Sequence, residues 1–102
     1  SDPLETIKKL IKERYPEAKA VFWAGSVLQK NDTASSDLDV VIVFDAIAHA
    51  YREAFMYDNW PIDAFIHDPD TIRYFFEKIE ANDGRPALIQ MILNGDEVLG
   101  HN

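Results

Sequence analysis

The sequence contains no cysteine, which excludes disulfide bonds and thiolate metal sites. No apolar run approaches the roughly 20 residues needed to cross a bilayer, and no signal-peptide pattern opens the chain. Basic residues are few, because 10 Lys and Arg against 18 Asp and Glu give a formal net charge of -8. Nucleic-acid duplexes are bound by clustered Lys and Arg, so this balance argues against a duplex as a partner. We therefore expect a cytoplasmic protein that does not associate with membranes.

The remaining composition is typical of a small globular domain. The chain has 102 residues, of which 47% are apolar and 27% charged, so we expect one domain over residues 1–102. Short apolar runs predict strands over residues 20–24, 38–44 and 60–67. Apolar residues at helical spacing predict helices over residues 3–15, 46–57, 69–81 and 86–94, with a short helix from residue 26. We expect an α/β fold in which helices pack against a small mixed sheet.

Two aspartates stand at the start of the second predicted strand. Asp37 and Asp39 are separated by one residue and are followed by the apolar run 40–44. Residues two apart on a strand project from the same face, so both carboxylates should point to one place. A third aspartate, Asp63, lies inside the strand predicted over residues 60–67. Three convergent carboxylates are a suitable ligand set for a hard divalent cation such as Mg2+.

A Gly-Ser turn precedes this acidic pair. Gly25-Ser26 directly follows the strand predicted over residues 20–24, and ten residues separate Ser26 from Asp37. A glycine turn lets backbone N–H groups approach a phosphate closely. A metal site beside a phosphate cradle is typical of phosphoryl or nucleotidyl transfer.

The two motifs together resemble the signature of the DNA polymerase beta-like nucleotidyltransferase superfamily. The resemblance is carried by Phe22-Trp23-Ala24-Gly25-Ser26 and, after a spacer, by Ser36-Asp37-Leu38-Asp39-Val40-Val41-Ile42-Val43. The third acid of the family lies in a later apolar strand, as Asp63 does in Ile62-Asp63-Ala64. The match covers roughly residues 21–67 and is most similar to small bacterial nucleotidyltransferase-domain proteins, akin to aminoglycoside and minimal nucleotidyltransferases.

The resemblance implies a role for each of the three aspartates. Asp37 and Asp39 would bind two Mg2+ ions, for which Mn2+ could substitute. Asp63 would hold the catalytic metal and help to deprotonate the acceptor hydroxyl. All three are therefore predicted to be both catalytic and metal-binding residues.

The resemblance also implies a nucleotide-binding set. Gly25 would permit close approach of the backbone to the triphosphate, and Ser26 would bond a phosphate oxygen. Lys30 and Ser36 complete the predicted nucleotide-binding residues. The chain departs from the family at Val27, because many members carry a basic residue soon after Gly-Ser.

The reaction implied by the resemblance moves a nucleoside monophosphate from a nucleoside triphosphate, with ATP as the default, to a hydroxyl acceptor, with release of pyrophosphate. The acceptor would be a small molecule or a protein hydroxyl, and the acidic chain favours a cationic small molecule. Two alternatives stay open: an antitoxin-like or partner-binding module of the same fold, and an inactive fragment of a two-domain enzyme. The helix predicted over residues 86–94 is apolar on more than one face, so a homodimer or a missing helical domain would cover part of it.

Other charged residues have simpler interpretations. Arg52 and Arg73 are predicted to pair with surface acids. Asp68 and Asp70 precede a predicted helix and are interpreted as caps. His67 is interpreted as a strand-end residue.

Overall fold

The computed structural model describes residues 2–23, 37–81, 92 and 95–99. These residues form two helices and a five-stranded sheet. In chain order the elements are α1 (Pro3–Arg14), β1 (Ala20–Trp23), β2 (Leu38–Val43), β3 (Tyr51–Tyr57), β4 (Trp60–His67), α3 (Pro69–Ala81) and β5 (Asp96–Leu99). Neither described helix is long and apolar enough to cross a membrane. The fold is α/β with a mixed sheet, as the sequence predicts.

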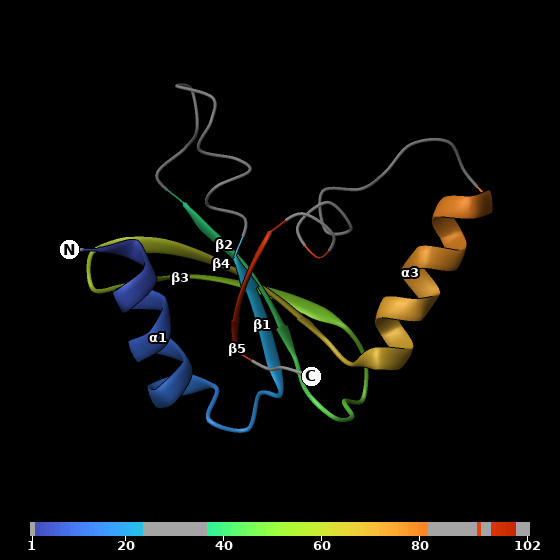
Figure 1. Cartoon of the computed structure of the whole chain (residues 1–102), viewed down its shortest axis with the longest axis horizontal. Coiled ribbons are helices and arrows are strands. Elements are labelled where there is room, and N and C mark those ends of the chain that lie inside the picture. The colour runs from blue at the N-terminus through green and yellow to red at the C-terminus, as the bar shows by residue number, and fades with distance from the viewer. Residues whose placement is uncertain (1, 24–36, 82–91, 93–94, 100–102) are drawn as a thin grey trace.

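The sheet has the strand order β3-β4-β2-β1-β5. Strands β2 and β4 run parallel in the centre, with Asp39 opposite Asp63 and Val43 opposite His67. The other neighbouring pairs are antiparallel. Figure 1 shows α1 and α3 on opposite sides of this sheet. The two faces of the central strands are therefore covered by different helices, α1 on one face and α3 on the other.

Alternation along the central strands divides their side chains between these two faces. The face toward α1 buries Ile7 and Leu10 of the helix against six strand residues: Leu38, Val40, Ile42, Ile62, Ala64 and Ile66. The opposite face packs Val41, Val43 and Phe65 against Ile72 and Phe75 of α3 and against Ile92. Because side chains alternate along a strand, Asp39 and Asp63 belong to the α3 face and not to the α1 face.

The helix predicted over residues 46–57 is wrong. Residues 51–57 form strand β3, which pairs with β4 from Tyr51 opposite Ile66 to Tyr57 opposite Trp60. The two strands are joined by Asp58 and Asn59, whose φ angles are 49° and 67°. Positive φ at both central residues is the geometry of the tight turn that matches the twist of a hairpin, and Asp and Asn tolerate it well. The turn and the pairing with β4 therefore override the helical spacing of apolar residues.

Contacts with α1 also support β3. Glu53 and Phe55 point toward α1, where Glu53 accepts a hydrogen bond of 2.8 Å from the hydroxyl of Tyr15. The guanidinium of Arg14 lies 4.1 Å from the centre of the Phe55 ring. A strand places alternate residues on one face, which these contacts require. Residues 52 and 54 then face the opposite side, the side of Asp63.

The C-terminal part differs from the prediction as well. The helix predicted over residues 86–94 falls outside the described residues except for Ile92, so its apolar face and the dimer or domain expected to cover it stay predictions. Residues 96–99 form β5, a strand that the sequence pattern did not predict, and it pairs antiparallel with β1. The short helix predicted from residue 26 also lies outside the described residues.

The remaining elements agree with the sequence patterns, and α3 shows why. Asp68 precedes the helix, and its Oδ1 accepts a hydrogen bond of 2.8 Å from the backbone N–H of Thr71. In return the hydroxyl of Thr71 accepts a hydrogen bond of 2.9 Å from the backbone N–H of Asp68. This reciprocal pair satisfies two N–H groups at the start of the helix. Asp68 is thus a cap, as predicted, and its second oxygen is engaged by the backbone N–H of Ile47 at 3.0 Å.

Candidate active site

The candidate site is built on the two parallel strands at the centre of the sheet. Asp39 is the second residue of β2 and Asp63 is the fourth of β4, and the register places them directly opposite each other. Both lie on the face away from α1. Neighbouring strands are about 4.8 Å apart, so two carboxylates in register on one face lie close together. The strand pairing alone therefore creates an acidic pair.

Asp37 extends this pair to a cluster. It lies immediately before β2, two residues from Asp39, and its side chain is exposed. Burial raises the pKa of Asp39 above its ordinary value, and the negative charges of Asp63 and Asp37 raise this pKa further. Asp39 is half-buried, whereas Asp63 is buried. The three predicted acids thus interact electrostatically at one end of the sheet.

A basic side chain from β3 completes the cluster. The Nε of Arg52 donates to Oδ1 of Asp63, and its Nη2 donates to Oδ2, both at 2.6 Å. The Arg52 side chain is 64% exposed, while that of Asp63 is 11% exposed. Arg52 stands opposite Phe65, two positions along β4 from Asp63, and its guanidinium lies 5.4 Å from the centre of the Phe65 ring. This two-pronged ion pair raises the pKa of Arg52, chiefly through the hydrogen bond to Asp63.

The donor chemistry of the cluster fits a hard divalent cation, because carboxylate oxygens are the ligands such ions prefer. Burial is the main cause of the raised pKa of Asp39, and the negative charges of Asp63 and Asp37 add to it, which a bound cation would offset. Among the described residues, however, no group of three or more His, Asp or Glu side chains is arranged to hold a metal ion. In this arrangement Arg52 engages both oxygens of Asp63.

The predicted nucleotide-binding residues Gly25, Ser26, Lys30 and Ser36 lie outside the described residues. The ends of the segment that contains them are described. Strand β1 ends at Trp23, opposite Val40 of β2, and the chain returns at Asp37. The segment therefore begins and ends at the edge of the sheet where the acids lie.

Arg52 is the member of this site that sequence reasoning missed. The prediction that Arg73 pairs with a surface acid is confirmed, because its Nη1 lies 2.9 Å from Asp70. The same prediction for Arg52 is wrong, because its partner is the buried Asp63. The Asp58-Asn59 turn could have revealed this. A hairpin closed at that turn places residue 52 diagonally across from residue 63, where long side chains reach each other.

His67 lies on the same face as Asp63, four residues further along at the end of β4. Its Nδ1 is 2.8 Å from the hydroxyl of Thr71, and its ring packs edge-on against Phe75 at 5.1 Å between centres. Burial lowers the pKa of His67, and the charge of Asp68 opposes this effect. These contacts tie the end of β4 to α3 and agree with the interpretation as a strand-end residue.

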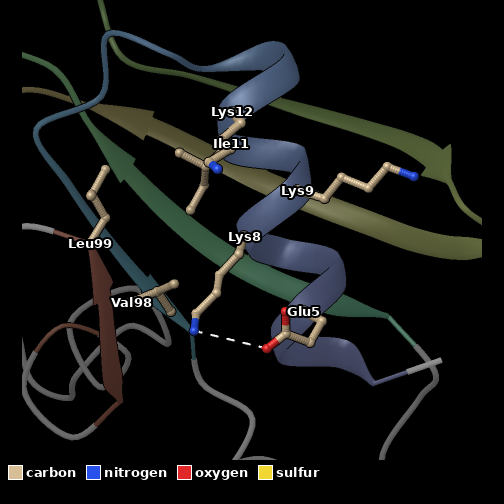
Figure 2. A pocket seen from close by; sticks show the side chains of 7 residues that line it. All are labelled: Glu5, Lys8, Lys9, Ile11, Lys12, Val98 and Leu99. Carbon is tan, nitrogen blue, oxygen red and sulfur yellow. Dashed lines mark ion pairs between the residues drawn. The ribbon is translucent and has the colours of Figure 1, made fainter.

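A pocket of about 480 Å³ lies elsewhere, between α1 and β5. Its lining combines apolar side chains of both elements with charged residues of the helix: Glu5, Lys8, Lys9, Ile11, Lys12, Val98 and Leu99. Figure 2 shows Lys8 paired with Glu5, while Lys9 points away from the β5 side chains. Lys9 instead lies 3.1 Å from Asp58. The pocket is on the α1 side of the sheet, so it is separate from the acidic cluster.

Comparison with known proteins agrees with this architecture. A family model described as a nucleotidyltransferase domain matches residues 4–95. A nucleotidyltransferase-like protein from Exiguobacterium sibiricum 255-15 has a similar solved structure, with a TM-score of 0.69 and 10% sequence identity. The similarity covers 99% of this chain and 35% of that one, so this chain spans about a third of that protein. At such identity the likeness shows the fold alone, and a comparison with curated proteins found no match. The family match over most of the sequence shows that the chain belongs to the nucleotidyltransferase domain family, with the polymerase beta-like fold.

Proposed function

We propose that this domain transfers a nucleoside monophosphate from a nucleoside triphosphate, with ATP as the donor, to an acceptor hydroxyl, and releases pyrophosphate. The observation that carries the proposal is the register of β2 and β4, which places Asp39 opposite Asp63 on a face not covered by α1. The family match supplies the reaction class, and the acidic cluster supplies the chemistry that this reaction needs.

In this proposal Asp37, Asp39 and Asp63 hold two Mg2+ ions, and Mn2+ can replace them. When bound, these ions neutralise the phosphates and make the acceptor oxygen more acidic. The protein contributes rigid strands that hold Asp39 and Asp63 at adjacent positions. A cluster of carboxylates repels a triphosphate, and bound Mg2+ would offset this repulsion. In the proposed reaction Asp63 also helps to deprotonate the acceptor hydroxyl, which requires an oxygen not taken up by Arg52.

The segment between Trp23 and Asp37 supplies the triphosphate site in this proposal. Its ends lie at the acidic edge of the sheet, next to Val40 and Asp39. Gly25 and Ser26 would contact the triphosphate, and Lys30 and Ser36 would add further contacts. The acceptor is a small molecule or a protein hydroxyl, and the net charge of -8 favours a cationic small molecule.

The test is a transfer assay with labelled nucleotides. The protein is incubated with Mg2+, each of the four radiolabelled triphosphates and a panel of cationic small molecules and tyrosine-containing proteins. We expect label to move from ATP to an acceptor hydroxyl. Asp39→Asn and Asp63→Asn should abolish the transfer, while Asp45→Asn should retain it, because Asp45 is 81% exposed and pairs with Lys19 away from the cluster.

Transfer that persists in both Asp39→Asn and Asp63→Asn would contradict the proposal. If no acceptor becomes labelled, the partner-binding alternative gains support. Sedimentation of the protein with and without candidate partners then distinguishes a binding module from an enzyme whose acceptor is missing from the panel. The same measurement shows whether the chain forms a homodimer.

A further inference from the structure

Arg52 forms an ion pair with Asp63, the carboxylate that the proposed function assigns to a metal ion. Its guanidinium satisfies both oxygens of this carboxylate with two hydrogen bonds of 2.6 Å. A fork-to-fork ion pair of this kind is among the strongest single contacts of a carboxylate. A metal ion that approaches Asp63 would meet the positive charge of Arg52 on the same carboxylate and would compete with it for these two oxygens.

The two partners differ in how firmly they are held. The Asp63 side chain is 11% exposed and sits on a central strand, so it stays in place. The Arg52 side chain is 64% exposed and comes from β3, an edge strand of the described sheet. If the pair opens, the guanidinium of Arg52 returns to water, whereas the carboxylate of Asp63 stays buried and needs another cation in its place. The exposed partner is the arginine, and the buried partner is the predicted metal ligand.

The interactions of Arg52 with the other two aspartates also indicate competition with a metal ion. Arg52 interacts electrostatically with Asp39 and Asp37 as well as with Asp63. A single positive side chain thus relieves the repulsion among three carboxylates when no other cation is bound. A divalent cation would do the same with twice the charge, so the two cations have overlapping roles at one site.

We propose that Arg52 is an internal competitor of the divalent cation: its guanidinium holds Asp63 in the metal-free protein and is displaced from this carboxylate when the cation binds. The inference rests on the proposed function, because it takes Asp63 to be a metal ligand. It adds that Arg52 lowers the affinity of the site for metal while it stabilises the metal-free fold. Arg52 thus sets the concentration of divalent cation at which the site is occupied.

The experiment measures Mn2+ affinity of the whole chain directly, without nucleotide. Free Mn2+ is counted by electron paramagnetic resonance as the metal is titrated into the wild type, Arg52→Gln, Arg52→Lys and Arg73→Gln. Arg73 is a matched control, because it is also 64% exposed and also pairs with an aspartate, on α3. We expect Arg52→Gln to bind Mn2+ about tenfold more tightly than the wild type, since one competing charge-assisted pair is lost.

Arg52→Lys keeps the charge but not the planar fork, so its affinity should lie between those of the wild type and Arg52→Gln. Arg73→Gln should bind like the wild type. The lysine variant also keeps the test decisive if Arg52→Gln does not fold. Unfolding temperatures without metal should fall for Arg52→Gln, and added Mn2+ should restore more of the loss than in Arg73→Gln.

Each of the remaining outcomes contradicts a specific part of the proposal. Equal Mn2+ affinity in the wild type and both Arg52 variants overturns the competition but leaves the proposed transfer intact. Weaker binding in those variants also overturns it, and makes Arg52 a support for the metal-binding geometry. Absence of Mn2+ binding in every protein overturns both the competition and the metal dependence of the proposed function.

Discussion

Asp39→Asn offers a test of the acidic cluster that needs no substrate. Burial and the charges of Asp63 and Asp37 raise the pKa of Asp39. A carboxyl whose pKa is raised by folding is less well accommodated as an anion in the folded chain than in the unfolded one. Asparagine keeps the shape of the side chain and removes the charge. We therefore expect the metal-free variant to be more stable than the wild type at neutral pH.

The magnitude follows from the register of the strands. Asp39 and Asp63 face each other across neighbouring strands, so their carboxylates are taken to be about 5 Å apart. Two unit charges at that distance repel by about 3 kcal/mol at an effective dielectric constant near 20 and by less than about 1 kcal/mol in bulk water. Arg52 offsets part of this repulsion, and solvent screens the half-buried Asp39 further. We expect a gain of about 1 kcal/mol, or roughly 4–8 °C in Tm for a domain of this size.

The assay is urea and thermal unfolding of the wild type, Asp39→Asn and the exposed control Asp45→Asn in the presence of a chelator. The penalty from Asp39 is fully present above its raised folded pKa, and it is lost as pH falls below the ordinary value of about 3.9. The gain in Asp39→Asn should thus be clear at pH 7 and fade toward pH 3.5. Added Mg2+ should stabilise the wild type more than the variant.

Two results would refute this reasoning. A variant no more stable at pH 7 than Asp45→Asn would show that the carboxylates do not repel each other in the folded chain. A gain of equal size at pH 7 and pH 3.5 would show that it arises from something other than the charge of Asp39.

Three further substitutions test the elements that frame the site, each by urea unfolding. His67→Gln should flatten the pH dependence of the unfolding free energy between pH 7 and 5. Because the pKa of His67 is lowered in the folded chain, the wild type loses up to about 1.4 kcal/mol of stability per pH unit as pH falls through about 6.5. An unchanged slope in the variant would contradict this. Asp68→Ala removes the bonds to the N–H groups of Thr71 and Ile47 and should cost about 1–2 kcal/mol; a cost near zero would show that the cap contributes nothing. Asn59→Ala should cost about 1 kcal/mol at φ 67°, whereas Asn59→Gly should not, and equal costs would refute the turn geometry.

The elements that sequence patterns predicted correctly are those with strong local signals. The apolar run after Asp39 and the alternation from Trp60 to His67 can hardly form anything but strands, and the structure has them as β2 and β4. Helix α3 combines a cap, a proline at its start and apolar residues at helical spacing, and it too is confirmed. From these elements alone Asp39 and Asp63 could be assigned to strands.

What the sequence did not reveal depends on pairing between distant segments. Residues 51–57 have apolar positions that suit a helix, and their strand conformation comes from pairing with β4 and from the turn at Asn59. Strand β5 is four residues long, and it pairs with β1 far along the chain. Such tertiary pairing overrides local preference. Arg52 was missed for the same reason, since its place beside Asp63 exists only once the hairpin is known.

The parallel pairing of β2 with β4 also fixes the alignment of Asp39 with Asp63. A slip of one residue would turn Asp63 toward α1 and bring Ile62 and Ala64, which are 2% and 0% exposed, out of the core. Burying a carboxylate among apolar side chains without a partner costs several kcal/mol, which is a large fraction of the stability of a small domain. A sheet with this misalignment would therefore lose much of the stability of the domain. The packing of the core thus also fixes the register that places Asp39 opposite Asp63.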